Sequence, residues 1–161
     1  MKTRILFTLT AFCVALIVSG TFRTVSGESP LLSPQALEPY GLARLWFNQI
    51  DIDPKRSKIL SLLVEGEQVF VVSNDARLHA LDAQTGKPLW SRSLGSREML
   101  IQEPAANSRM IAVVNGLELF VLNRQNGKLL MHIGLPGAAS TACELSENYV
   151  YIYLSGSDFR V

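Results

Sequence analysis

Short apolar runs alternate with turn residues along most of the chain, beginning at about residue 42. In the clearest run, Val69 and Val71 fall on one face of an extended strand, and Phe70 and Val72 fall on the other. Both faces are therefore apolar, which is typical of strands that neighbours cover on both sides. No stretch keeps the 3.6-residue period of an amphipathic helix. The pattern predicts an all-β fold, with strands at about 58–64, 67–73, 77–82 and 87–93 in its best unit.

The same order of strands and turns recurs after about 41 residues. Asp82 is followed at that interval by Asn123, and an earlier partial copy places Trp46 44 residues before Trp90. A third copy begins near residue 149. A period near 40 residues with about four short strands per unit is typical of β-propeller blades. The residues expected to build this structural repeat are Trp46, Asp82, Gly86, Trp90, Asn123 and Gly127.

Each of these residue types has a physical reason at its position. The side-chain oxygens of Asp82 and Asn123 can accept hydrogen bonds from nearby backbone N–H groups and so start a turn. Gly86 and Gly127 can adopt the left-handed conformation that returns a short loop into the next strand. The large side chain of Trp90 is expected to fill the gap between adjacent blades.

Residues 69–91, VFVVSNDARLHALDAQTGKPLWS, closely resemble the PQQ-like β-propeller repeat. The features that carry the resemblance are a strand, a small turn, Ala-Leu-Asp, Thr-Gly-Lys and Leu-Trp. Residues 111–131 match more loosely, because Met131 stands where the better copy has Trp90. The resemblance covers roughly residues 44–161 and implies a partial β-propeller of about two to three four-stranded antiparallel blades.

The resemblance allows two kinds of function. The repeat occurs in quinoprotein dehydrogenases, which hold pyrroloquinoline quinone (PQQ) and calcium, and in non-catalytic propellers similar to the BamB-type outer-membrane assembly factors. The quinoproteins also use an adjacent pair of cysteines, whereas this chain has only Cys13 and Cys143. We therefore expect a non-enzymatic scaffold or protein-interaction module without a cofactor. A PQQ-dependent dehydrogenase or another cofactor-binding propeller is the alternative, and a gene fragment without a function of its own is a third.

Residues 1–27 have the features of an export signal. Lys2 and Arg4 precede an uncharged run over residues 5–18, and small residues follow at Ser19-Gly20. Cleavage of a signal peptide and retention of residues 5–22 as a membrane anchor both fit, since a span needs about 20 apolar residues. The protein is accordingly expected in the periplasm or cell envelope. Residues 28–41, which contain three prolines, are expected to form a linker to a propeller domain at 42–161.

Charge excludes one class of partner. Beyond residue 27 the chain has 12 basic and 14 acidic residues, a net charge of −2. This balance gives no electrostatic footprint for nucleic acid. Lys55, Arg56 and Lys58 form a short basic cluster, which we interpret as an exposed loop; an anionic lipid or nucleic-acid contact is the alternative.

The sequence offers few candidates for catalysis or metal binding. His79 and His132 lie in different repeats at different repeat positions, so they are interpreted as structural side chains. Asp51, Asp53 and Asp75 lack the spacing of a calcium loop. The segment 134–137 has neither the lysine of a phosphate loop nor the glycine spacing of a dinucleotide-binding turn.

Cys143 is expected to be a small buried strand residue, with a reactive thiol as the alternative. No catalytic residue, cofactor-binding residue or metal ligand is predicted.

Length adds one expectation. Even a four-bladed propeller needs roughly 160 residues, more than the residues that follow position 27. The chain is therefore expected to be an incomplete propeller, with exposed strand edges and apolar inter-blade faces. Other proteins are expected to bind through the propeller loops, and the remaining blades or another chain through the open edges.

Overall fold

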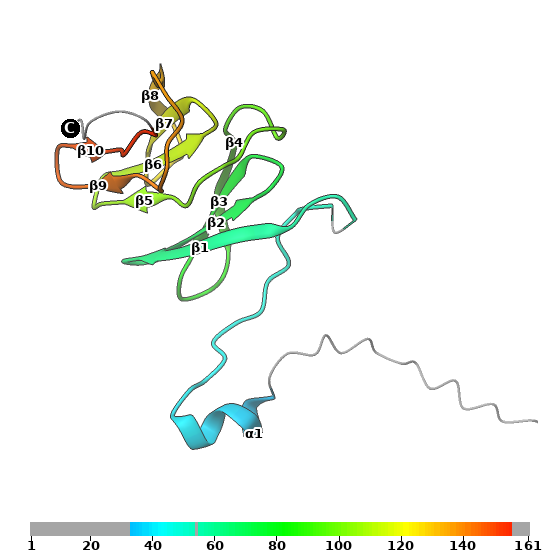
Figure 1. Ribbon diagram of the computed structural model, residues 1–161. Coiled ribbons are helices and arrows are strands. Elements are labelled where there is room, and N and C mark those ends of the chain that lie inside the picture. The colour runs from blue at the N-terminus through cyan, green and yellow to red at the C-terminus, as the bar shows by residue number, and fades with distance from the viewer. Residues whose placement is uncertain (1–32, 54, 156–161) are drawn as a thin grey trace, which may run out of the picture.

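The computed structural model describes residues 33–53 and 55–155. The predicted export signal at 1–27 and the alternative anchor at 5–22 lie outside these residues. Within the predicted linker, a short helix α1 (Pro34–Leu37) runs into a 3-10 turn η1 (Glu38–Tyr40). Figure 1 shows α1 standing away from the sheets on an extended segment. In the described part of the chain, no helix is long and apolar enough to cross a membrane.

The rest of the described chain is β-structure. The first four-stranded sheet has the order β1-β2-β3-β4 and the second has the order β5-β6-β7-β8, and every neighbouring pair is antiparallel. A two-stranded sheet of β9 and β10 follows. The bounds are β1 (Ile59–Glu65), β2 (Gln68–Ser73), β3 (Arg77–Asp82), β4 (Pro88–Ser93), β5 (Ala105–Ala106), β6 (Met110–Asn115), β7 (Glu118–Asn123), β8 (Leu129–Gly134), β9 (Glu144–Leu145) and β10 (Val150–Tyr151).

This arrangement confirms the predicted fold class, an all-β chain of partial propeller blades. The four strands expected in the first unit are those of the first sheet, with small differences at their ends. The looser copy forms the second sheet, and the third unit contributes only β9 and β10 among the described residues. Two four-stranded sheets with the same consecutive strand order are what the 41-residue spacing predicted, although β5 is much shorter than β1.

The main core lies between the two four-stranded sheets. Phe70, Val72 and Leu78 of the first sheet pack against Ile111 and Val113 of the second. Because successive strand residues point to opposite faces, Val69 and Val71 form part of a separate cluster on the far face of the first sheet. The central strands β2 and β3 are therefore buried on both faces, as their uninterrupted apolar sequence predicted.

The outer apolar face of the first sheet is only partly covered. The segment 42–51 crosses it in extended form, and Trp46 and Ile50 pack against Val69 and Val71. Leu62 and Val64 of β1 are 61% and 58% exposed. This agrees with the expectation that an apolar inter-blade face stays open.

Candidate functional site

The repeat residues build matching turns in the two sheets. After β3, Asp82 Oδ1 accepts hydrogen bonds from the backbone N–H groups of Gln84 (3.1 Å) and Thr85 (2.7 Å). Its bond from the Thr85 hydroxyl is the main reason that the pKa of Asp82 is lowered. After β7, Asn123 Oδ1 accepts from the N–H groups of Gln125 (3.0 Å) and Asn126 (3.2 Å). The carboxylate oxygen of Asp82 and the amide oxygen of Asn123 thus accept equivalent backbone hydrogen bonds in the two turns.

The glycine of each turn makes room for a tryptophan of the neighbouring unit. Gly86 and Gly127 have φ angles of 70° and 66°. A Cβ atom on Gly127 would lie 2.5 Å from an indole carbon of Trp90, and a Cβ atom on Gly86 would collide with Trp46 in the same way. Glycine is therefore required at both positions for two reasons: the backbone is left-handed, and a Cβ atom would overlap the indole ring.

Each indole also donates a hydrogen bond into the next unit. Trp46 Nε1 donates to the Ala83 carbonyl (2.8 Å), and Trp90 Nε1 donates to the Arg124 carbonyl (2.9 Å). Trp90 lies 6.0 Å from Phe70, measured between ring centroids. These contacts place the tryptophans in inter-blade packing.

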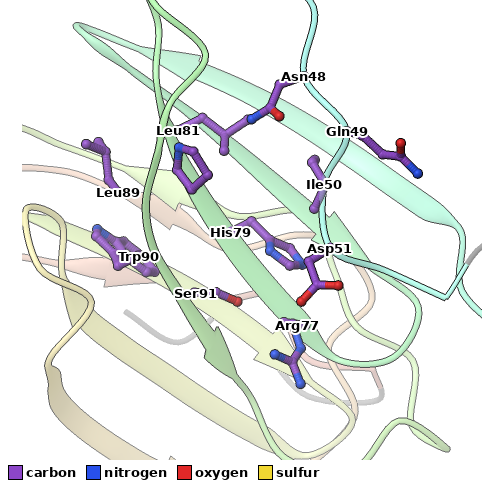
Figure 2. Close-up of a pocket in the computed structure, with 11 residues that line it drawn as sticks. Asn48, Gln49, Ile50, Asp51, Arg77, His79, Leu81, Leu89, Trp90 and Ser91 are labelled. Atoms are coloured by element: carbon purple, nitrogen blue, oxygen red, sulfur yellow. The ribbon is translucent and has the colours of Figure 1, made fainter.

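A pocket of about 260 Å³ lies between the extended segment 48–51 and the strands β3 and β4. Figure 2 shows its two ends. Asp51, Arg77 and His79 gather at one end, and Leu81 and Leu89 lie toward the other. The sequence analysis considered His79 and Asp51 separately, because it placed them in different elements, and it did not predict that they line one pocket.

His79 is the buried polar group of this pocket. It is 6% exposed, and its Nε2 atom is buried without a hydrogen-bond partner. Burial lowers the pKa of His79, and the positive charge of Arg77 lowers it further, whereas Asp75 and Asp51 act in the opposite direction. The neutral imidazole is therefore the form favoured in the fold.

The other candidates of the sequence are held in structural contacts. His132 Nε2 lies 3.1 Å from Glu118 Oε1, and its ring stacks on Phe120 with centroids 4.4 Å apart. Asp53 Oδ1 accepts from the N–H of Lys55 (3.0 Å). The carboxylate of Asp75 accepts from the Ser73 hydroxyl. In the part of the chain that the structure describes, no three His, Cys, Asp or Glu side chains form a group suited to a metal.

Cys143 is buried as expected, but it precedes β9 instead of lying within a strand. Burial raises the pKa of its thiol to about 11. Its Sγ lies 3.6 Å from the Ala112 carbonyl, on the face where the second sheet meets the third unit. Cys143 therefore lies in the segment that connects the second sheet to the third unit, and the expectation of a strand position is wrong by one residue.

The loop before β5 and the turn between β6 and β7 carry three exposed apolar residues, Met99, Leu100 and Leu117, which we call the apolar patch. Their side chains are 58%, 71% and 52% exposed. The loop is ordered, because the Gly116 N–H donates to the Leu100 carbonyl (2.9 Å) and the Gln102 N–H to the Val114 carbonyl (2.8 Å). Sequence reasoning missed this patch, since its members come from a connection and from a turn.

Comparisons with known proteins place the chain in a family. A family model described as outer membrane protein assembly factor BamB matches residues 43–152. No curated protein sequence matches the chain. Solved structures with a similar fold include BamB from Moraxella catarrhalis, at 18% identity and a TM-score of 0.48, covering 58% of this chain and 29% of that one. The chain thus spans less than a third of that relative.

Two further solved structures are similar over part of their length. Apo AztD from Citrobacter koseri has 16% identity and a TM-score of 0.45, covering 52% of this chain and 25% of that one. A europium-containing methanol dehydrogenase has 18% identity and a TM-score of 0.39, covering 49% of this chain and 15% of that one. The match of the family model over residues 43–152 decides the assignment: the chain belongs to the PQQ-like β-propeller family of the outer membrane protein assembly factor BamB.

Proposed function

We propose that this chain is part of an exported, non-enzymatic β-propeller that binds another protein in the cell envelope. The observation that carries the proposal is the apolar patch of Met99, Leu100 and Leu117 on an ordered loop. Propellers bind partners through loops that a rigid set of blades positions. The family of the chain, named for a factor in outer membrane protein assembly, supports a protein partner.

The patch favours a partner that presents apolar side chains. Three large apolar side chains are exposed to water on a loop that backbone hydrogen bonds hold in place. Exposed apolar groups that lie together commonly mark protein interaction sites. Their burial by a partner would remove the cost of this exposure, about 25 cal/mol for each Å² of apolar surface. The proposal includes no PQQ and no calcium.

Site-specific photo-crosslinking in the envelope tests the proposal. A crosslinking amino acid at position 100 should give a defined protein adduct, and Leu117→Asp should abolish that adduct. The matched control is position 42, because Leu42 is 60% exposed but lies on the segment outside the sheets. Equal adducts at positions 100 and 42, or an adduct that survives Leu117→Asp, would refute a specific surface at the patch.

Localisation and cofactor binding are tested separately. We expect cell fractionation to recover the protein in the envelope, and the mass of its N-terminal peptide to show whether residues 1–27 are removed. Purified protein should not quench or shift the fluorescence of added PQQ in the presence of calcium. Saturable PQQ binding would instead favour the quinoprotein alternative.

A further inference from the structure

The outer edge of β8 is an unpaired strand edge. β8 ends the order of the second sheet, and no strand among the described residues pairs with its other side. Backbone hydrogen bonds alternate along an antiparallel pair of strands. Because the Leu135 N–H donates to the Leu117 carbonyl, the backbone groups of Ile133 also face β7, and those of His132 face outward. Outward N–H and C=O groups on a strand edge are a template for a further strand.

β8 also lacks the residues that usually protect such an edge. Proline and charged side chains commonly block pairing with another chain. β4 has the same place in the first sheet and carries Pro88 and Arg92. β8 has no proline, lysine, arginine, aspartate or glutamate, and all six of its residues are exposed. The edge of β4 is therefore protected, whereas the edge of β8 is open to strand addition.

A pocket of about 310 Å³ lies beside the start of β8, between the two four-stranded sheets. Its apolar lining includes Phe120 and Leu129, and Leu129 is 48% exposed. Arg92 and Lys128 also line it and are exposed, and no described residue that lines it is acidic. The two sheets that form this pocket are both in place, so it is not a face that awaits a further blade. A pocket next to a free strand edge selects among the side chains of an added strand.

We propose that β8 binds an extended segment of another polypeptide chain as an additional strand of the second sheet. The backbone of the segment pairs with the outward groups of β8, including those of His132. A large apolar side chain of the segment enters the pocket and packs against Phe120 and Leu129. An acidic side chain two positions away lies on the same face of the segment, near the positive charges of Arg92 and Lys128. This surface is independent of the apolar patch, whose residues lie outside β8 and outside the pocket.

The edge and the pocket together select this class of partner over others. A small molecule would fill the pocket but leave the outward N–H and C=O groups of β8 unpaired. A helix uses its own backbone groups along its length and has none to offer to a strand edge. A basic segment would bring charges of the same sign to Arg92 and Lys128. An extended segment that carries an apolar and an acidic residue satisfies both features.

Fluorescence anisotropy with the full 161-residue chain tests the proposal. The probe is the fluorescein-labelled peptide Thr-Val-Thr-Phe-Thr-Glu-Thr-amide, in which valine, phenylalanine and glutamate share one face of the strand. The reversed sequence is used beside it, because strands pair in both directions. We expect at least one of the two peptides to bind with a Kd below about 200 µM. Alanine in place of the phenylalanine of the probe should weaken binding about tenfold or more.

N-methylation of the probe separates strand addition from contacts of side chains alone. A strand uses the N–H groups of one alternate set of residues to pair on one edge, and an N-methyl group removes that donor. Methylating the alternate set that faces β8 should abolish binding. Methylating the other set should change the Kd by less than about twofold. Equal binding of the two methylated probes would refute strand addition.

Variants of the protein locate the edge. His132→Pro removes an outward N–H that β7 does not use and should abolish binding, whereas His132→Ala keeps this N–H and should preserve binding. Ser91→Pro is the matched control, because Ser91 faces outward at the same place in β4. Proline is tolerated on edge strands where its position faces solvent, and far-UV circular dichroism of each variant checks the fold. Lys128→Gln should weaken binding about two- to fivefold, and Lys87→Gln at the corresponding position of the first sheet should not.

Several results would overturn the proposal. One is the absence of saturable binding of both peptides at protein concentrations up to about 500 µM. Another is a folded His132→Pro variant that binds the probe as the wild type does, or a Ser91→Pro variant that loses binding equally. If His132→Pro does not fold, the methylated probes decide. Loss of the crosslink at position 100 would leave this proposal untouched, and loss of peptide binding would leave the proposal for the apolar patch untouched.

Discussion

Replacing Gly127 with alanine tests whether this glycine exists for the indole of the neighbouring blade. Its φ of 66° costs an alanine about 1–2 kcal/mol. The new Cβ would also lie 2.5 Å from an indole carbon of Trp90, a rigid ring packed in the inter-blade core. Overpacking of this kind costs about 1–3 kcal/mol. We therefore expect Gly127→Ala to lower the free energy of unfolding by about 2–5 kcal/mol.

Gly116→Ala is the matched control. Gly116 has a similar φ of 61°, and the nearest atoms to its Cβ position are Met99 Cβ and Cγ at 3.1 Å, a contact that a shift of a few tenths of an ångström relieves. Only the conformational cost should remain, about 1–2 kcal/mol. Urea unfolding followed by far-UV circular dichroism measures both values, and an unchanged m-value shows that the extent of unfolding is the same.

A double-mutant cycle isolates the contact itself. In a Trp90→Leu background the indole is gone, so Gly127→Ala should cost only about 1–2 kcal/mol. The coupling between the two sites is then about 1–3 kcal/mol. The reasoning is refuted if Gly127→Ala costs no more than Gly116→Ala, or if its cost is the same with and without the indole.

Three further predictions follow from single side chains. Burial lowers the pKa of His79 from 6.5, so the unfolded chain binds a proton at a higher pH than the folded chain does. The free energy of unfolding should therefore fall as the pH is lowered from about 7 to about 5. His79→Phe should remove this contribution to the pH dependence of the urea midpoint. In a Cys13→Ser background at about pH 8, iodoacetamide should alkylate Cys143 about a hundredfold more slowly in the folded chain than in urea, since its pKa of about 11 keeps the thiol protonated; equal rates would mean that the thiol is accessible. The Arg124 guanidinium donates to Gln68 Oε1 (2.8 Å), to the Asn107 carbonyl (2.9 Å) and to the Glu65 carbonyl. Arg124→Ala should therefore lower the free energy of unfolding in urea by about 2–3 kcal/mol. Arg97→Ala, the control, should lower it by less than about 0.5 kcal/mol.

The blades could be predicted because their signals are local. Dense apolar strands such as 69–72 report burial on both faces, and the constant spacing from Asp82 to Asn123 reports a repeated unit. The first signal depends on neighbouring residues, for which strand geometry fixes which side chains share a face. The second compares two short motifs, each of which is local, at a fixed interval along the chain. The turn chemistry was equally local, since Asp82 binds groups within three residues of itself.

The pocket could not be predicted in the same way. Asp51 belongs to an extended segment that has no strand partner among the described residues, whereas Arg77 and His79 alternate along β3. Alternation places Arg77 and His79 on one face, but it does not say what covers that face. The position of Asp51 depends instead on Trp46, whose packing near Gly86 fixes where the extended segment crosses the sheet. The 44-residue spacing from Trp46 to Trp90 was therefore the available signal for the site.

A second set of hydrogen bonds between units shows that the same contact can form with different residues at equivalent repeat positions. Two positions after each tryptophan, Asn48 Nδ2 donates to the Gly86 carbonyl (2.6 Å) and Arg92 Nε donates to the Gly127 carbonyl (2.9 Å). Asparagine and arginine share no shape or charge, so sequence comparison does not pair them, yet each supplies an N–H donor at the same place.

The next unit departs from this rule. Met131 and Ile133 stand at the corresponding positions and have no N–H group in their side chains. The hydrogen bonds there come from the β5–β6 hairpin, where Asn107 Nδ2 donates to the Ser146 carbonyl (2.7 Å) and Arg109 Nη2 to the Glu147 carbonyl (2.8 Å). A Met131→Trp substitution should therefore gain little stability, because the donor that accompanies each indole in the first two interfaces is missing from position 133.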